Sequence, residues 1–266
     1  MASPIWTGAA SGNWNTAGNW DTGSAPVGGD SVTFKSGSVD VTTGPSSAIN
    51  LASLTVTNGY GGNWTDLVTL GTITALSMNG AGSRYRLSAT VTTGVLDINP
   101  QTVISHEGGT WTTVTCSGTG NVERSGTGVW TTSYVTSSAL KVTATSANQT
   151  WTTVNNTGTI ITAGSIGTYN STGNDRLTTT GAAAISTAAT ITSGAIFNHI
   201  SSGTITLLNA QAGSSFPCLG CADNFTITTA NIYAGSDVNE RPAGITVTFG
   251  TKNYIGKNMA PGGNPL

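Results

Sequence analysis

Residues that could carry out acid–base chemistry are few in this chain. It contains only three glutamates, Glu107, Glu123 and Glu240. Hydrolysis of a glycosidic bond needs two carboxyl groups about 5–10 Å apart. Glu107 and Glu123 lie 16 residues apart, and no recognisable spacing joins either one to a nucleophile or a base. No carboxylate pair and no catalytic residue are predicted, and the chain is expected not to be an enzyme.

The two histidines and the adjacent opposite charges are predicted to be structural. His106 precedes Glu107 in ISHEGG, a composition typical of a polar turn, and His199 in AIFNHISSG is expected to point outward from a strand. Motifs of metalloproteases, serine hydrolases and phosphate-binding loops are missing from the sequence. Solvated turns or partner contacts are expected for three adjacent pairs, which are Glu123-Arg124, Asp175-Arg176 and Glu240-Arg241.

Cys218 and Cys221 form the only site-like motif, CxxC. A zinc ribbon needs a second pair of ligands, and only Cys116 and the two histidines remain. A thioredoxin-like role needs a βαβ setting, which the sequence does not offer. Two buried thiols or a local disulfide are expected first, and a metal shared between subunits is the alternative that would use both cysteines. No cofactor is predicted.

The composition indicates an all-β protein with few charges. Charged residues make up 8% of the 266 residues, against roughly 25% in ordinary soluble domains. Nine basic and eleven acidic residues give a net charge of -2 without a basic run, which argues against binding to nucleic acid. Thr, Ser and Gly dominate, and such a composition excludes a helical bundle or coiled coil.

Three segments are predicted from local patterns. Residues 1–30 form a tryptophan-rich arm and cap, residues 31–215 a body of short strands, and residues 216–266 a small β element with a loose tail. The body alternates apolar and polar residues over four to six positions between turn formers. In the last segment, strong alternation and a hairpin pattern near Gly250 predict a small antiparallel element or a cap.

The tripeptide Trp-Thr-Thr repeats at Trp111, Trp130 and Trp151, which are 19 and 21 residues apart. A period near 20 built from short strands predicts solenoid coils in which like residues stack. We therefore expect a right-handed parallel β-helix with about eight coils of roughly 20 residues, in which Glu107 and Glu123 fall at different corners. A β-sandwich or jelly roll is the alternative.

The start of the chain resembles a known module. Its residues Trp6-x-Gly8, Asn13-Trp14 and Asn19-Trp20 are followed by Pro26, Asp30, Val32 and Phe34. This pattern resembles the tryptophan-rich module of bacterial and phage surface β-helix proteins, including autotransporter passengers and phage virion proteins. The resemblance covers about 35 residues and implies that this stretch leads into the first coils of a right-handed β-helix.

The three N-terminal tryptophans have two interpretations. Trp6, Trp14 and Trp20 could cover the end of the apolar column, which would otherwise expose unpaired backbone groups. Alternatively, their ring faces could form a platform for a sugar. A cap is the expected role because the end of a solenoid needs one.

The sequence predicts a protein that reaches the outside on a particle. We find no secretory signal pattern at MASPIWTG, and no run approaches 18 apolar residues. Autotransporters need a signal peptide and a membrane barrel, and neither is recognised here. A component of a tailed-phage virion, assembled in the host cytoplasm, fits these expectations.

The expected function is that of a non-enzymatic capsid decoration or cement protein that bridges capsid subunits, with the major capsid protein or other virion proteins as partners and a homotrimer as the assembly. Alternatives are a tail-fibre or tailspike-type adhesin that binds host cell-surface glycan, and a bacterial surface protein. Neither nucleic acid nor a membrane is an expected partner. The particle contact is predicted in the two terminal segments, at Ala2, Ser3, Pro4, Ile5, Met259, Pro261, Pro265 and Leu266.

Overall fold

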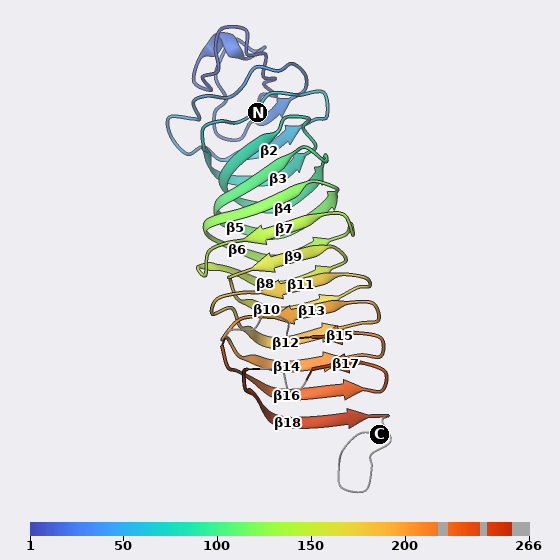
Figure 1. Cartoon of the computed structure of the whole chain (residues 1–266). Helices are drawn as coiled ribbons and strands as arrows, with labels where there is room; N and C mark the ends of the chain where they lie inside the picture. The colour runs from blue at the N-terminus through green and yellow to red at the C-terminus, as the bar shows by residue number, and fades with distance from the viewer. Residues whose placement is uncertain (218–222, 240–243, 257–266) are drawn as a thin grey trace, which may run out of the picture.

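The protein is an elongated rod of stacked β-coils (Figure 1). The computed structural model describes residues 1–217, 223–239 and 244–256. Its strands pair in parallel from coil to coil, through about 11 coils of roughly 20 residues each. The prediction of a parallel β-helix is confirmed, and the β-sandwich alternative is wrong. The only helix in the described ranges is the short 3-10 turn η1, Ala17–Asn19.

The three longest strands, of 15 or 16 residues, lie near the middle of the chain and bend around a corner of the coil. Their bounds are β1 Ser31–Phe34, β2 Leu51–Val56, β3 Val68–Met78, β4 Arg84–Ile98, β5 Val103–Gly118, β6 Asn121–Val135, β7 Lys141–Ala144, β8 Gln149–Asn156, β9 Thr159–Thr162, β10 Ile166–Ser171, β11 Arg176–Thr179, β12 Ile185–Ile191, β13 Ile196–His199, β14 Ile205–Ala210, β15 Ser215–Phe216, β16 Phe225–Tyr233, β17 Asp237–Val238 and β18 Val247–Ile255.

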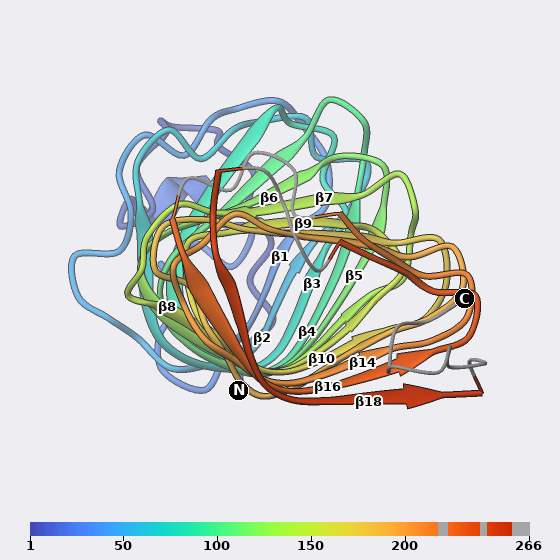
Figure 2. The same ribbon diagram turned by 60° about the horizontal axis from the view of Figure 1, so that its bottom comes forward.

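Two parallel ladders run along the rod. One ladder joins β1, β2, β3, β4, β5, β6, β8, β10, β12, β14, β16 and β18 in that order. The other joins the first halves of β4, β5 and β6 to β7, β9, β11, β13, β15 and β17. The coils superimpose when the rod is seen closer to end-on (Figure 2), so residues that pair between coils form columns along the axis.

The repeated tryptophans form one of these columns. Trp111 pairs with Trp130, and Trp130 with Trp151, as the spacing predicted. The Trp111 and Trp130 rings stack with centroids 5.6 Å apart and an angle of 13°, whereas Trp151 meets Trp130 edge-on at 6.3 Å. Four isoleucines continue the column on later coils, at Ile166, Ile185, Ile205 and Ile227. All seven side chains are buried, and each contributes about 1.5–3 kcal/mol or more to stability.

The C-terminal region continues the solenoid, and the antiparallel element predicted there is wrong. β16 pairs in parallel with β14, and β18 pairs in parallel with β16. Gly250 lies inside β18 rather than in a hairpin turn. Isolated bridges from residues before Ser31 and strands after Phe216 also add to the stack, and the rod has about 11 coils instead of the eight expected from the body alone.

The N-terminal cap is an aromatic cluster, as expected. Trp6, Trp14 and Trp20 surround Phe34, with ring centroids 4.9–5.9 Å apart. Below them, Phe34 contacts Tyr60 and Trp64 of the next coil. The side chain of Asn19 is buried, and its Oδ1 atom accepts hydrogen bonds from the backbone N–H groups of Ala10 and Ser11. The cap therefore closes the first coil with aromatic packing and satisfied backbone groups.

Candidate functional site

Glu107 and Glu123 lie on one face of the rod, so the expectation that they fall at different corners is wrong, and both are held in ion pairs. Arg86 binds Glu107 through two N–H···O contacts of 2.6 and 3.0 Å, and Arg84 binds Glu123 at 2.8 Å. The bidentate contact with Arg86 lowers the pKa of Glu107 below its usual value. A general acid in a glycosidase needs a raised pKa, so the environment of Glu107 is the opposite of the one that this chemistry requires.

His106 lies in the core, so the prediction of a polar turn is wrong. Its ring is fully buried and packs 4.6 Å from the ring of Trp111. The Nδ1 atom accepts a hydrogen bond from the Trp130 indole N–H at 3.3 Å. Burial and the nearby guanidinium of Arg124 lower the pKa of His106 to about 3.

A strand irregularity beside His106 explains why alternation failed there. The pairing of β5 with both neighbouring strands shifts by one residue between His106 and Gly108. Gly109 has a φ of 90°, and a Cβ at this position would lie 2.1 Å from the carbonyl oxygen of Ala89. The glycines therefore serve a bulge that turns the corner of the coil, not a loop.

Arg124 occupies the same column as His106, one coil further along. The prediction of a solvated Glu123-Arg124 turn is wrong for Arg124, whose side chain is fully buried. Its guanidinium lies 4.6 Å from the Trp130 ring centroid and 4.1 Å from that of Trp151. The Nη2 group of Arg124 donates hydrogen bonds to the carbonyl oxygens of Gly128 and Thr150 at 2.9 and 3.2 Å. Burial lowers the pKa of Arg124 to about 9, so the group stays charged at neutral pH.

The prediction of a solvated turn at Asp175-Arg176 is wrong for Asp175. Its carboxylate is buried and accepts hydrogen bonds from Tyr169, Ser171 and Asn156. Burial raises the pKa of Asp175 above its usual value, and the hydrogen bonds oppose this shift. The neighbouring Arg176 is exposed at the start of β11. The pair is therefore split between core and surface, while Glu240 and Arg241 lie outside the described residues.

His199 points inward, contrary to the prediction. Its Nδ1 accepts a hydrogen bond from the Thr179 hydroxyl at 2.6 Å, and its Nε2 donates to the Gly203 carbonyl at 2.8 Å. The ring packs between Phe197 and Phe225. Burial lowers the pKa of His199 to about 4. These contacts place a neutral histidine in the core.

The cysteines show no site in the described part of the chain. Cys116 is a buried free thiol, and burial raises its pKa to about 12. Cys218 and Cys221, the weak metal candidates, lie outside the described residues. Across residues 1–217, 223–239 and 244–256, no group of three or more His, Cys, Asp and Glu side chains could hold a metal ion.

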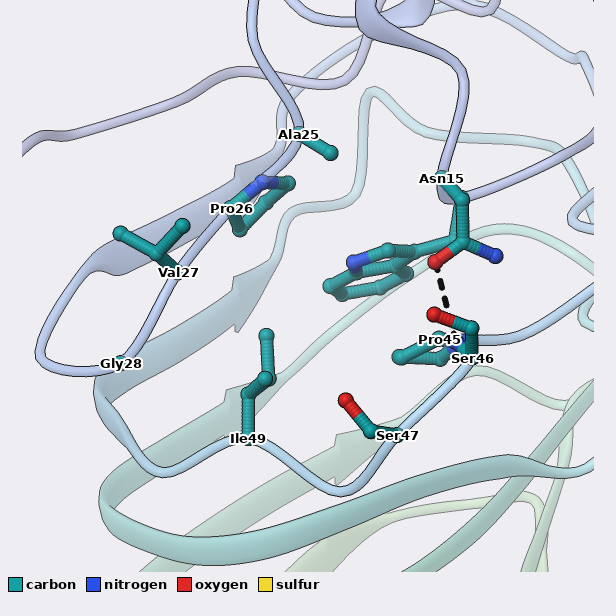
Figure 3. A pocket seen from close by; sticks show the side chains of 10 residues that line it. Asn15, Ala25, Pro26, Val27, Gly28, Pro45, Ser46, Ser47 and Ile49 are labelled. Carbon is teal, nitrogen blue, oxygen red and sulfur yellow. Dashed lines mark hydrogen bonds between the residues drawn. The ribbon is translucent and has the colours of Figure 1, made fainter.

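The N-terminal tryptophans cannot serve as a sugar platform because their side chains are 1–3% exposed. Beside them lies a depression of about 380 Å³ (Figure 3), lined by Trp14, Asn15, Ala25, Pro26, Val27, Gly28, Pro45, Ser46, Ser47 and Ile49. None of these residues is charged. The Asn15 side chain accepts a hydrogen bond from the Ser46 backbone N–H at 2.9 Å and joins the two walls. The Trp14 indole Nε1 is buried and has no hydrogen-bond partner among the described residues.

Residues 2–5 are ordered by their own chain. The Ala2 N–H donates to the Asp30 carboxylate, and the Ala2 and Pro4 carbonyls accept hydrogen bonds from β1. Ile5 forms a parallel bridge with Thr33. The predicted contact residues Ala2 to Ile5 are therefore held by hydrogen bonds within the chain, while residues 259–266 lie outside the described part.

The two ladders present different chemistry to solvent. The outer surface of the second ladder carries most of the charged side chains on the described strands, at Arg84, Arg86, Glu107, Glu123, Lys141, Arg176 and Asp237, whereas Asp97 and Lys252 lie on the first ladder. The first ladder carries two uncharged outward rows, which we call the Thr/Asn face. Its threonine row is Thr93, Thr113, Thr132, Thr153 and Thr168, and its mixed row is Val95, Thr115, Tyr134, Asn155, Asn170, Thr190, Asn209, Asn231 and Asn253.

Sequence reasoning did not single out the Thr/Asn face, although a signal for it was present. In the Trp-Thr-Thr repeat the tryptophan points into the core, and the second threonine joins the outward row. The repeat that predicted the fold therefore also marks the surface.

Comparison with protein-family models, curated proteins and solved structures finds no match for this chain. Among the described residues, no helix has the length and apolar character needed to cross a membrane. A function must therefore be inferred from the surfaces of the rod.

Proposed function

We propose that this protein is a non-enzymatic structural component of a tailed-phage virion, namely a decoration or cement protein that bridges capsid subunits. The observation that carries this proposal is the apolar surface at the N-terminal end of the rod. Val27 is exposed there and lines the uncharged depression beside Trp14, and Met1 and Val39 are two further exposed apolar side chains in the N-terminal region. Exposed apolar side chains around a depression are typical of protein interaction sites.

This arrangement supports attachment by one end. The N-terminal segment that was predicted to carry the contact, Ala2 to Ile5, lies along the first coil at this end. Attachment at this end would not use the flanks and would project the rod outward from the particle. We propose a homotrimer in which three rods pack side by side around a common axis, since lateral packing of solenoids covers part of their flanks.

A substitution at the apolar end tests the attachment. Val27, which is 62% exposed, does not contribute to the core, so Val27→Asp should fold normally. A buried unpaired carboxylate in the contact is expected to weaken binding to undecorated heads about ten-fold or more, measured by co-sedimentation.

The matched control is Val95→Asp, which adds the same charge to an exposed valine on the flank. It is expected to bind heads as the wild type does. Wild-type binding by Val27→Asp together with lost binding by Val95→Asp would instead put the contact on the Thr/Asn face.

The non-enzymatic part of the proposal makes its own prediction. Incubation with host capsular polysaccharide is expected to leave the chain length of the polysaccharide unchanged, as followed by size-exclusion chromatography. The reason is that Arg86 stabilises the ionised form of Glu107, the form that cannot donate a proton to a leaving group. Shortened chains that persist with wild-type protein but vanish with Glu107→Gln or Glu123→Gln would contradict this expectation.

A second candidate function is that of an adhesin that binds host cell-surface glycan. The observation that favours it is the uncharged, hydroxyl- and amide-rich Thr/Asn face. Mass spectrometry of purified particles separates the two functions, because decoration proteins occur in hundreds of copies and tail adhesins in far fewer.

A further inference from the structure

The Thr/Asn face is a regular array of hydrogen-bonding groups. Its rows repeat once per coil, about 4.8 Å apart, and the two rows are separated by two residues along each strand. The threonine row is unbroken over five coils, from Thr93 to Thr168. A ligand that lies along the rod axis would therefore meet equivalent groups at each step.

The mixed row is held by side-chain hydrogen bonds between Asn155 and Asn170 and from Thr190 to Asn253, whereas the threonine row is open. Side-chain amides donate from Asn231 to Asn209 at 2.8 Å and from Asn253 to Asn231 at 2.9 Å. By contrast, the hydroxyls of Thr113, Thr132 and Thr153 make no hydrogen bond within the described parts of the chain. These hydroxyls can donate to or accept from a ligand at no cost to the fold.

One exposed aromatic side chain lies among the open hydroxyls. Tyr134 is 40% exposed in the mixed row, between Thr115 and Asn155 of the neighbouring coils. An aromatic ring in a hydroxyl-rich surface can pack against the C–H groups of a sugar ring, while neighbouring protein hydroxyls form hydrogen bonds with the sugar's hydroxyl groups.

A shallow depression of about 300 Å³ adjoins the threonine row. It is lined by a set of mostly hydroxyl-bearing residues at the corner of the coil, namely Thr150, Trp151, Thr152, Thr153, Ser165, Ile166, Gly167, Thr168, Ser186 and Thr187. The depression has no charged residue in its lining, and neither outward row has one. The electrostatics therefore favour a neutral ligand over an acidic one.

We propose that the Thr/Asn face binds a neutral, extended polysaccharide along the rod axis, with Tyr134 packed against a sugar ring. Every sugar unit of a polysaccharide carries hydroxyl groups that donate and accept hydrogen bonds. The threonine hydroxyls of the face can likewise act as donors and as acceptors, so the two match. This inference gives a binding surface to the second candidate function, and it holds whether or not the N-terminal end attaches to a capsid.

A second copy of the chain fits this face less well. The centre of a stable protein interface is enriched in aromatic and other apolar side chains. Here the rows consist almost wholly of Thr and Asn, and each hydroxyl or amide buried against protein would need its own partner. Tyr134 and Val95 are the exposed large apolar side chains on the face.

Affinity electrophoresis in gels that contain dextran, galactomannan, hydroxyethylcellulose or heparin tests the proposal on the full chain. The wild type is expected to be retarded by at least one neutral polysaccharide and not by heparin. Tyr134→Ala should lower the affinity about ten-fold, because it removes the stacking face. Thr132→Asp should weaken binding by a similar factor, because it places a charge in the neutral row.

Matched controls separate this inference from the attachment proposal. Thr178→Asp puts the same charge on the opposite ladder and should bind polysaccharide normally, as should Val27→Asp. Tyr134→Ala should bind undecorated heads normally. Lack of retardation in all three neutral gels, or equal retardation of wild type, Tyr134→Ala and Thr132→Asp, would overturn the proposal. Loss of self-association in Tyr134→Ala, with polysaccharide binding unchanged, would make the face an interface between copies.

Discussion

The free energy of unfolding is expected to fall steeply as the pH drops from 6.5 to about 4. The cause is the burial of His106 and His199, whose pKa values are lowered to about 3 and about 4 in the native state. Between pH 6.5 and 4 the unfolded chain takes up protons at these histidines that the native protein excludes. Stability is therefore fully present above pH 6.5 and is lost as the pH falls.

Each histidine contributes a slope of about 1.4 kcal/mol per pH unit in this window, so the two together remove roughly 6 kcal/mol by pH 4. Asp175 acts in the opposite direction, since its raised pKa makes the native state bind a proton more readily as the pH falls. Its effect offsets part of the loss. The lowered pKa of Glu107 adds to the loss only below its ordinary range, near pH 4.

Urea unfolding at a series of pH values measures this slope. His106→Gln and His199→Gln each remove one titrating group, so each is expected to lower the slope by about half, whatever its effect on stability at pH 7. The slope is the informative quantity because either variant also loses core packing. A wild-type stability that stays constant from pH 7 to 4.5, or equal slopes in all three proteins, would contradict the assignment of neutral core histidines.

Arg124→Ala is expected to destabilise the protein by about 3 kcal/mol. The substitution removes two cation–π contacts, leaves the Gly128 and Thr150 carbonyls without this donor, and opens a cavity between Trp130 and Trp151. Relief of the cost of burying a charge offsets part of this loss. Thermal and urea unfolding at pH 7 give the value.

Two comparisons make the Arg124 prediction specific. Arg84→Ala removes an arginine from a surface ion pair whose side chains are 47% and 44% exposed, and it should cost less than about 1 kcal/mol. Arg124→Met keeps much of the side-chain volume and should recover part of the loss. A methionine variant more stable than the wild type would mean that burying the guanidinium costs more than its contacts return.

The spacing of the repeated tryptophans was sufficient to predict the coil and its register. Residues at the same phase of a coil must stack when the coils pair in parallel, so the spacing of Trp111, Trp130 and Trp151 translates directly into a column. The cap was likewise predictable, because a solenoid end requires cover and the tryptophans cluster there.

The buried polar residues could not be predicted from local composition. His106 lies beside a bulge that breaks the alternation of inward and outward residues, and its glycine neighbours resemble a turn. Arg124 becomes stable in the core only through the rings of Trp130 and Trp151, which lie on its own coil and the next. Contacts between coils of this kind are invisible to a window of ten residues.

Alternation alone could not predict the direction of strand pairing at the C-terminus. Alternation in β16 and β18 fixes which side chains point inward, but the same alternation suits parallel and antiparallel neighbours. The 22-residue offset between paired positions such as Phe225 and Val247 was the usable signal, because it matches the period of the preceding coils.

Because the column position of Trp130 recurs at Trp151 one coil later, with Thr132 paired to Thr153, one coil of this rod is a modular unit of length. Duplication or loss of a segment of about 20 residues in this register would preserve every column and change only how far the tip stands from the base, by about 4.8 Å per coil. Genetic change can thus adjust the reach of the molecule in small, fixed increments while both ends keep their own structure.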